Sequence, residues 1–444
     1  MFFSLIFSLF FCSIFSILIC SEVVILVSSF FFLLLLSKGS ETQLEMIFFS
    51  DKITFVTILL SLFVTFLGGA TLSLLKEKGK MSVFSFTSMI MIIFFFSSNP
   101  LFLFIFFELS LIPVFFMVVG WGAQPERLKA GKFMALYTLI ASFPLFFLFI
   151  FFFLNTPGWT GSSFTPSFLL VDWKWISFFS QSKSLLFFAV LAFFVKTPVF
   201  FFHSWLPKAH VEATITGSMI LAGTMLKMGV YGLIRIFSFF ANFYMITFFL
   251  SVCICGALIS SSLSLSVDDM KQTVAFSSVS HMNFCAAVLM TFSELGKSSC
   301  VLILFTHALS SCGLFYLVTK CYSNSGSRSV SVSKGVLSLA PSLSLISFIC
   351  WAISMAAPPS LTFSSEVLGL SSISSKSFYF IFLSLIFVLV NSFFSMFNFG
   401  VLSNSGSKIF LKDEVSLLNI SIGVFVSFPL IVLFFFPSSI FLIF

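Results

Sequence analysis

Six ionisable side chains lie inside long apolar runs of the sequence, where a charge is costly. They are Glu108, Lys196, Lys227, His281, His307 and Glu366. A charged group at the middle of a bilayer costs about 2.5–3.5 kcal/mol on insertion scales. Such groups are therefore rare in membrane helices, and they usually face the bundle interior and serve a function. Two carboxylates, two amines and two imidazoles in one chain favour a path for protons.

The chemistry of these groups suits proton transfer. Burial disfavours the charged form of both Glu and Lys, whereas a nearby opposite charge favours it. A change in the separation of Glu108 and Lys196 would therefore change which group holds a proton. Histidine titrates near neutral pH and can pass a proton onward. The alternative is that charged pairs only hold helices together, but six such groups in one bundle favour a relay.

The composition indicates the elements that must position these groups. Of 444 residues, 59% are hydrophobic and 8% are charged, whereas soluble globular proteins have roughly 25% charged residues. This excludes a soluble domain, and the high hydrophobicity excludes a disordered chain. The apolar runs are continuous and do not alternate with polar residues, which favours helices over a membrane β-barrel. The chain is predicted to be an all-α polytopic membrane protein.

The apolar runs predict about fourteen transmembrane helices in a single membrane domain, residues 1–444, because a span needs about 20 apolar residues. The predicted spans are 1–20, 22–36, 53–75, 81–97, 101–119, 133–154, 184–206, 213–236, 243–265, 273–292, 298–319, 335–371, 378–399 and 415–436. The first two are the least clearly separated from each other.

Two of the predicted spans are interrupted by proline close to a charged residue. Pro198 follows Lys196, and the pair Pro358-Pro359 precedes Glu366. Proline removes a helical hydrogen bond and clashes with the preceding turn, so both helices are expected to break. Two broken helices in corresponding places are typical of an inverted internal repeat. We expect N-terminal helices in 1–80, a first inverted repeat in 81–236, a second in 243–399, and a C-terminal helix in 400–444.

The positive charge predicts the orientation in the membrane. With fourteen spans, one set of alternate loops carries nearly twice as many Lys and Arg residues as the other. The positive-inside rule places the richer set in the matrix or cytoplasm and both termini on the opposite side. Residues 1–36 contain one charged residue, Glu22, and lack the basic residues of a signal or transit peptide. We therefore expect insertion where the chain is made, in an organelle or a bacterial inner membrane.

Other patterns that could carry chemistry are weak. His203, His210 and Glu212 could suggest a metal site, but a nearby proline break and the lack of a second cluster argue against one. The nine cysteines contain no CxxC pair, so iron–sulfur ligation is not expected. Nucleotide-binding glycine motifs are missing. The net charge of +7 resides in short loops, which favours membrane topology over nucleic-acid binding. We expect neither a metal site nor a cofactor-binding residue in this chain.

Several segments around these groups resemble a known family. They are ELSLIP at 108–113, WGAQPERLKAG at 121–131, HSWLPKAHVEA at 203–213, GSMILAG at 217–223 and SSVSHM at 277–282. They resemble the chain 4 family of NADH–ubiquinone oxidoreductase subunits, and the resemblance covers about residues 101–366. The chain departs from the usual family pattern, without losing a titratable relay group, at Thr214, Thr216, Phe276, Thr362 and Ser365.

The resemblance implies a fold and an activity. Members of this family are antiporter-like membrane subunits of respiratory complex I, with fourteen helices, two inverted five-helix repeats and two broken helices. In the family, the residues that match Glu108 and Lys196 form a switchable pair. The residue that matches Lys227 is the central proton carrier. The implied activity is proton translocation, as a subunit of H⁺-translocating NADH:ubiquinone reductase.

The resemblance also implies the exit path and the partners. Residues matching His281, His307 and Glu366 lead toward the exit through the second repeat. Energy comes from quinone reduction in other subunits, which also hold FMN, iron–sulfur clusters, NADH and ubiquinone, and the chain itself does no redox chemistry. The expected partners are the neighbouring antiporter-like chains 2 and 5, accessory subunits and lipids such as cardiolipin.

The expected location is the mitochondrial inner membrane, with both termini on the intermembrane-space side. Two alternatives stay open. The first is a cation/proton antiporter subunit outside complex I, which would share the fold and the charged groups. The second is a structural scaffold that only clamps neighbouring subunits.

Overall fold

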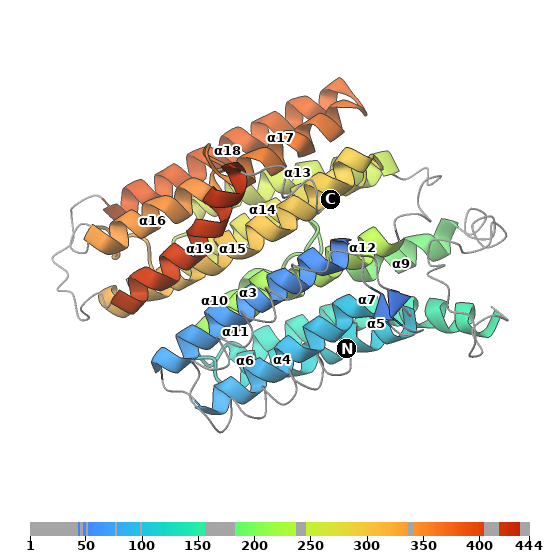
Figure 1. The fold of residues 1–444 in the computed structure, drawn as a ribbon, viewed down its shortest axis with the longest axis horizontal. Helices are drawn as coiled ribbons and strands as arrows, with labels where there is room; N and C mark the ends of the chain where they lie inside the picture. The colour runs from blue at the N-terminus through green and yellow to red at the C-terminus, as the bar shows by residue number, and fades with distance from the viewer. Residues whose placement is uncertain are drawn as a thin grey trace. The chain divides into compact units, whose positions relative to one another are not determined.

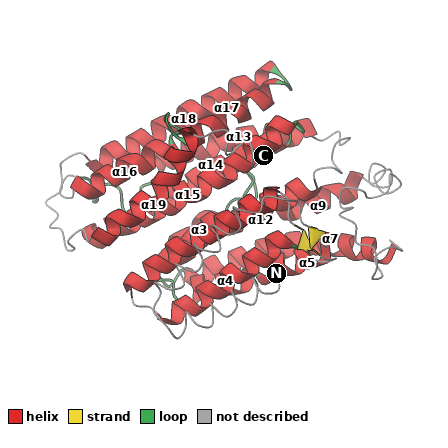
Figure 2. Cartoon of the chain, in the orientation of Figure 1, coloured by secondary structure: helices red, strands yellow, loops and turns green. Residues whose placement is uncertain are grey.

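The computed structural model is almost entirely helical (Figures 1 and 2). It describes residues 43–44, 48–49, 52–75, 78–97, 100–155, 183–236, 246–335, 341–403 and 417–435. The predicted spans 1–20 and 22–36 lie outside the described residues. The chain divides into two compact units, Met1–Lys196 with Lys227–Phe243, and Thr197–Leu226 with Tyr244–Phe444. The all-helical prediction is confirmed.

The first unit is built from helices that pack as neighbours along the chain. Its elements are β1 (Gln43–Leu44), β2 (Phe48–Phe49), α3 (Lys52–Leu75), α4 (Lys78–Phe96), α5 (Pro100–Leu109), α6 (Leu111–Val119), α7 (Arg127–Asn155), α9 (Lys183–Lys196) and α12 (Leu226–Ile236). The first residue of α12, Leu226, belongs to the second unit. Helix α3 packs against α4, and α7 packs against α5, α6 and α9. The two short strands form an antiparallel pair that the sequence did not predict.

The second unit surrounds one long buried helix. Its elements are α10 (Trp205–Glu212), α11 (Ile215–Ile220), the π-helix η1 (Leu221–Met225), α13 (Ile246–Ser266), α14 (Met270–Leu289), α15 (Glu294–Ser325), α16 (Pro341–Ser354), α17 (Leu361–Ser374), α18 (Phe378–Ser403) and α19 (Leu417–Phe435). Helix α15 contacts α11, η1, α14, α16, α17 and α19. Its apolar segment, long enough to cross a membrane, is 100% buried. The core of the second unit therefore forms around α15.

Eight helical segments of the described residues are long and apolar enough to cross a membrane. They are Ile53–Leu72, Gly79–Phe96, Leu101–Val119, Arg127–Ile150, Ile215–Arg235, Ile246–Ser266, Glu294–Ser325 and Phe378–Ser403. All eight coincide with predicted spans. The full count of fourteen stays a prediction, because some spans are undescribed and others form shorter helices.

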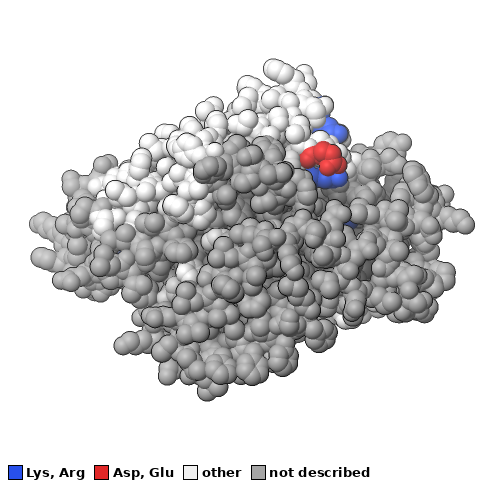
Figure 3. All heavy atoms as spheres, viewed as in Figure 1, with Lys and Arg blue, Asp and Glu red and all other residues white. Residues whose placement is uncertain are grey.

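Large apolar side chains cover the outward faces of α7 and α18. Ile140 and Phe147 are exposed on α7, and Leu389 and Phe393 are exposed on α18. In the view of Figure 3, a small group of Lys, Arg, Asp and Glu side chains lies beside uncharged residues in the part of the surface that the structure describes. The exposed apolar side chains of α7 and α18 suit contact with lipid hydrocarbon, where an unpaired charge is costly.

One predicted span, 101–119, is divided in the structure. Helix α5 ends at Leu109 and α6 begins at Leu111, with Ser110 between them. The physical reason is Pro113, which has no N–H to donate to the carbonyl of Leu109 and whose ring crowds the preceding turn. Glu108 therefore lies two residues before a local discontinuity at Ser110. The prediction of one continuous helix over 101–119 is therefore wrong at this point.

The first predicted helix break is confirmed, and an asparagine from another helix satisfies its backbone. The chain leaves the helix after Lys196 and resumes at Trp205. In between, Asn283 of α14 donates from Nδ2 to the carbonyl of Pro198 at 3.1 Å. Its Oδ1 accepts from the N–H of Phe200 at 3.0 Å. A buried peptide group without a partner is costly, so Asn283 makes this break tolerable.

The second predicted break is also confirmed, and its backbone is satisfied in a related way. Helix α16 ends at Ser354 and α17 begins at Leu361. Asn391 of α18 donates from Nδ2 to the carbonyl of Ser354 at 3.1 Å. Thr362 donates from Oγ1 to the carbonyl of Ile353 at 2.8 Å. At each break, therefore, an amide from a neighbouring helix binds a carbonyl that the broken helix leaves free.

Replacing Asn283 with leucine should destabilise the protein by about 1–3 kcal/mol for each backbone group that loses its partner. Leucine is close to asparagine in size but can satisfy neither the Pro198 carbonyl nor the Phe200 N–H. The measurement is the thermal stability and the amount of the chain in detergent-solubilised membranes. As a control, Ser262→Ala removes an exposed hydroxyl that bonds only within its own helix. Equal stability of the two variants would contradict the assignment.

Candidate functional site

Lys196 is buried at the last position of α9, and its side chain reaches α5. Its Nζ donates to the carbonyl oxygen of Phe107 at 2.5 Å and lies 3.2 Å from the centroid of the Phe107 ring. The same carbonyl also accepts from the hydroxyl of Ser110 at 2.7 Å. A carbonyl dipole and an aromatic face both attract a cation. This contact therefore provides a place for the lysine ammonium within the apolar interior.

Glu108 follows Phe107 directly, and its charge attracts that of Lys196. Both carboxylate oxygens of Glu108 are buried and have no hydrogen-bond partner within the described part of the chain. Glu108 is thus placed to interact with the ammonium of Lys196. The structure brings these two predicted residues together.

Lys227 is completely buried and lies two residues after the π-helix η1. The π-helix occupies Leu221–Met225, within a predicted span that was expected to be regular α-helix. A π-helical turn adds one residue and rotates the side chains that follow it, and such turns often occur at functional sites. The position of Lys227 around α12 is therefore set by this turn.

One contact joins α12, which carries Lys227, to α9, which carries Lys196. Gly232 of α12 lies directly against the ring of Phe193 of α9, so that a Cβ at this position would collide with the ring. The lack of a side chain at Gly232 therefore leaves room for this ring between the two helices. The contact of Lys196 with Phe107 joins α9 to α5 in the same way.

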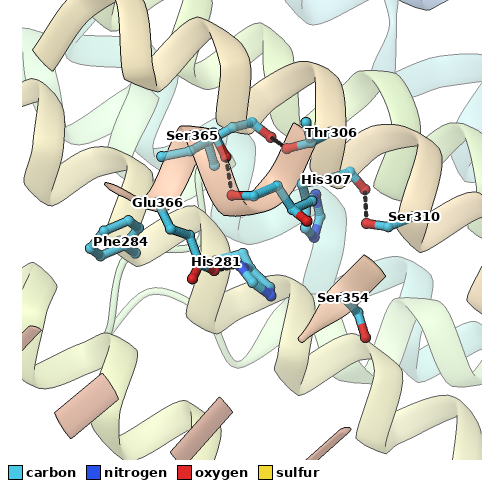
Figure 4. Close-up of a pocket in the computed structure, with 10 residues that line it drawn as sticks. His281, Phe284, Thr306, His307, Ser310, Ser354, Ser365 and Glu366 are labelled. Carbon is cyan, nitrogen blue, oxygen red and sulfur yellow. Dashed lines mark hydrogen bonds and ion pairs between the residues drawn. The ribbon is translucent and has the colours of Figure 1, made fainter. Parts of the chain in front are cut away.

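In the second unit, His281, His307 and Glu366 line a small cavity (Figure 4). Nδ1 of His281 lies 3.9 Å from Oε1 of Glu366. The imidazole rings of His281 and His307 have centroids 5.6 Å apart. The cavity offers about 10 Å³ to the centre of a water-sized sphere, which is about the space for one water. The structure therefore brings all three predicted residues of this unit to one site.

Hydroxyl groups complete the polar wall of this cavity. Ser310 donates to the carbonyl of His307 at 3.2 Å, and Ser365 donates to the carbonyl of Thr362 at 2.7 Å. Thr306 also lines the cavity. A hydroxyl that donates within its own helix keeps two lone pairs that can accept from a water or an imidazole. These side chains can therefore hold a water between the imidazoles and the carboxyl group.

Two aromatic rings pack beside the polar groups of the cavity. Phe387 meets the imidazole of His281 edge-on, with centroids 6.1 Å apart. Phe284, which lines the cavity, stacks on Phe387 at 5.2 Å. Apolar surroundings of this kind strengthen the electrostatic interactions of the polar groups beside them.

The structure leaves one link of the predicted relay untested. Glu108, Lys196 and Lys227 belong to the first unit, whereas the two histidines and Glu366 belong to the second. A route through all six residues therefore stays a prediction. Sequence reasoning did not single out Asn283, because its bonds join residues that are more than 80 positions apart.

The remaining histidines have other surroundings. The ring of His210 stacks on Phe315 at 4.6 Å, and that of His203 stacks on Phe200 at 4.9 Å. Glu212 lies 3.7 Å from Arg328. Among the described residues, no group of three or more His, Cys, Asp or Glu side chains is placed to hold a metal ion.

The chain is similar to proteins of known name. The sequence profile of a family described as NADH:quinone oxidoreductase/Mrp antiporter, transmembrane, matches residues 97–395. NADH-ubiquinone oxidoreductase chain 4 of Ceratitis capitata is 40% identical over 357 residues, covering 78% of this chain and 76% of the relative. The protein of the same name from Locusta migratoria is 36% identical over 419 residues, covering 93% and 90%.

A solved structure has the same fold. A chain of respiratory complex I from Thermus thermophilus with bound NADH superposes with a TM-score of 0.78, covering 95% of this chain and 90% of the other, at 19% identity. At this identity the likeness shows the fold alone. Because the family profile spans well over half of the sequence and the curated relatives match most of their own length, the chain belongs to the NADH:quinone oxidoreductase/Mrp antiporter family and groups with its chain 4 members.

Proposed function

We propose that this chain translocates protons as a membrane-arm subunit of NADH:ubiquinone oxidoreductase. The observation that carries the proposal is the match to relatives named NADH-ubiquinone oxidoreductase chain 4 over nearly the whole chain. The buried ionisable groups in both units support it, because a chain that only filled space in the membrane would not need them. Quinone reduction in other subunits supplies the energy.

The proposed relay begins at Glu108 and Lys196. In one state the ammonium of Lys196 rests on the carbonyl and ring of Phe107. In another it moves to the carboxylate of Glu108, which then stays charged. While Glu108 is charged, it holds the ammonium of Lys196 away from Lys227. The movement of Lys196 therefore changes the proton affinity of Lys227. The pair thus acts as a switch for the central carrier.

The second part of the proposed relay uses the cavity of the second unit. A proton from Lys227 passes to His307 and His281 and then to Glu366. The 3.9 Å between Nδ1 of His281 and Oε1 of Glu366 is too long for a direct hydrogen bond. One water in the adjoining cavity would bridge it, since the cavity wall carries hydroxyl oxygens that can accept a hydrogen bond from that water. Glu366 then releases the proton toward the exit.

We further propose the complete architecture of fourteen helices with two inverted repeats, at residues 81–236 and 243–399. N-terminal helices in 1–80 and a C-terminal helix in 400–444 complete the single membrane domain. The two helix breaks support this proposal, because Asn283 and Asn391 each donate an amide hydrogen to the backbone of a break. Both termini would face the intermembrane space.

The proposed setting is the mitochondrial inner membrane. The neighbouring antiporter-like chains 2 and 5, accessory subunits and lipids such as cardiolipin would cover the apolar outer faces of helices such as α7 and α18. FMN, iron–sulfur clusters, NADH and ubiquinone would bind to other subunits, so this chain would carry protons without a cofactor of its own.

The second candidate is a cation/proton antiporter subunit outside complex I. The family profile itself includes Mrp antiporters, which makes this candidate specific. Purification decides between the two. A large assembly that contains flavin and iron–sulfur clusters supports the first, whereas sodium-dependent transport by a complex without flavin supports the second.

Replacing Lys227 with methionine should reduce proton pumping by at least about tenfold, because loss of a positioned proton-transfer group typically costs on the order of 10²-fold or more. Methionine keeps an unbranched side chain but cannot hold a proton. The measurement is proton uptake per NADH oxidised in vesicles that contain the assembled complex. Lys297→Met is the control, because Lys297 forms a surface pair with Glu294. Normal pumping by assembled Lys227→Met complex would reject the relay.

Replacing Glu366 with glutamine should also reduce pumping by about tenfold or more, since the amide preserves shape but cannot release a proton. The matched control is Glu294→Gln, because the Glu294 carboxylate is exposed and an exposed ion pair contributes little. Both variants are compared by NADH-driven proton uptake at equal complex content. If Glu366→Gln pumps as well as Glu294→Gln, the exit path does not pass through Glu366.

A further inference from the structure

Three polar residues follow one another along one face of α12. Lys227, Tyr231 and Arg235 are spaced four residues apart, and residues at this spacing lie above one another on a helix. Arg235 is the penultimate residue of α12. The row thus leads from the buried Lys227 to the end of its helix, over about 12 Å at 1.5 Å per residue. A row of this kind could be either a path for protons or an obstacle to them.

The hydroxyl of Tyr231 has all its hydrogen-bonding positions filled. It donates to the carbonyl of Phe95 at 2.9 Å. It accepts from Nε of Arg235 at 2.9 Å and from Nη2 at 2.8 Å. A tyrosine hydroxyl has one hydrogen to donate and two lone pairs that accept. It therefore has no lone pair left to receive a proton that leaves Lys227.

Aromatic packing fixes this arrangement. Tyr231 is completely buried and meets the rings of Phe94 and Phe95 edge-on, with centroids 5.6 and 5.3 Å away. The guanidinium of Arg235 lies 5.0 Å from the centroid of the Tyr231 ring. The hydroxyl cannot turn to a new partner without losing these contacts. The tyrosine is thus held in the state in which it blocks transfer.

We propose that Tyr231 and Arg235 form a barrier that closes the direct route from Lys227 along α12 to the nearest membrane face. Arginine does not lose its proton in proteins, so it repels a mobile proton at all working pH values. A pump whose central carrier was open to that face would dissipate the gradient it builds. The barrier rests on the proposed function of Lys227 and directs the proton of Lys227 away from the end of α12.

The test is passive proton conductance in liposomes that contain the assembled complex without NADH. A potassium diffusion potential drives protons inward, and an internal pH dye records their entry. Arg235→Gln should raise the proton conductance of the complex by about tenfold, which corresponds to ~1.4 kcal/mol. This is the repulsion between two unit charges ~12 Å apart at an effective dielectric constant near 20. Unchanged conductance in assembled Arg235→Gln complex would overturn the barrier.

Two further variants separate a barrier from a structural clamp. Arg235→Lys keeps the positive charge and should stay close to the parent conductance, although it loses the forked hydrogen bonds. A lysine ammonium can still donate to the hydroxyl of Tyr231. Tyr231→Phe keeps the ring but removes the hydroxyl to which either cation would donate, so the charge is no longer held on the row and the complex should leak. If Arg235→Lys leaks as much as Arg235→Gln, packing rather than charge closes the route, and the proposed barrier is wrong.

The double variant Arg235→Gln with Lys227→Met tests whether the leak passes through Lys227. The double variant should be as tight as the parent, because the carrier is gone. A persistent leak would show a route that avoids Lys227 and would reject the barrier as stated. The pumping of Lys227→Met alone tests the proposed function. Lost pumping in that variant together with a tight Arg235→Gln complex would reject the barrier and leave the relay standing.

Discussion

The hydrocarbon interior supplies no water, so every charge and every unpaired peptide group inside it needs a partner from the protein. Lys196 obtains one from the main chain and ring of Phe107. The break beside it obtains one from Asn283. The cost of leaving either group alone is several times the thermal energy. The contact of α9 with α5 meets the first need, and the position of Asn283 on α14 meets the second.

The same constraint explains why irregular helices coincide with ionisable residues. Glu108 comes just before the interruption at Ser110, Lys196 comes just before an unwound segment, and Lys227 follows a π-helical turn. Each irregularity frees or displaces a backbone carbonyl, and such a carbonyl can accept from a cation or a water. Regular helices use their carbonyls internally and offer nothing to a proton carrier.

The sequence predicted the long helices and the two helix breaks well, because both leave local signals. Continuous apolar runs gave the positions of long helices such as α3 and α18, and Pro198 and Pro358 gave the two breaks. The division at Ser110 was also within reach, since Pro113 is visible in the sequence. The π-helix before Lys227 could not be predicted, because its residue types differ little from those of an α-helix. The bonds of Asn283 and the contact of Tyr231 with Phe95 depend on tertiary packing.

The ammonium of Lys196 rests on a peptide oxygen, and this has a genetic consequence. Every amino acid at position 107 would present the same carbonyl, so no substitution there can delete the acceptor itself. Lys196 differs in this respect, because a substitution at its codon removes the side-chain amine itself. A substitution at 107 therefore removes only the ring beneath the ammonium and leaves the peptide acceptor in place, whereas a substitution at 196 removes both contacts at once.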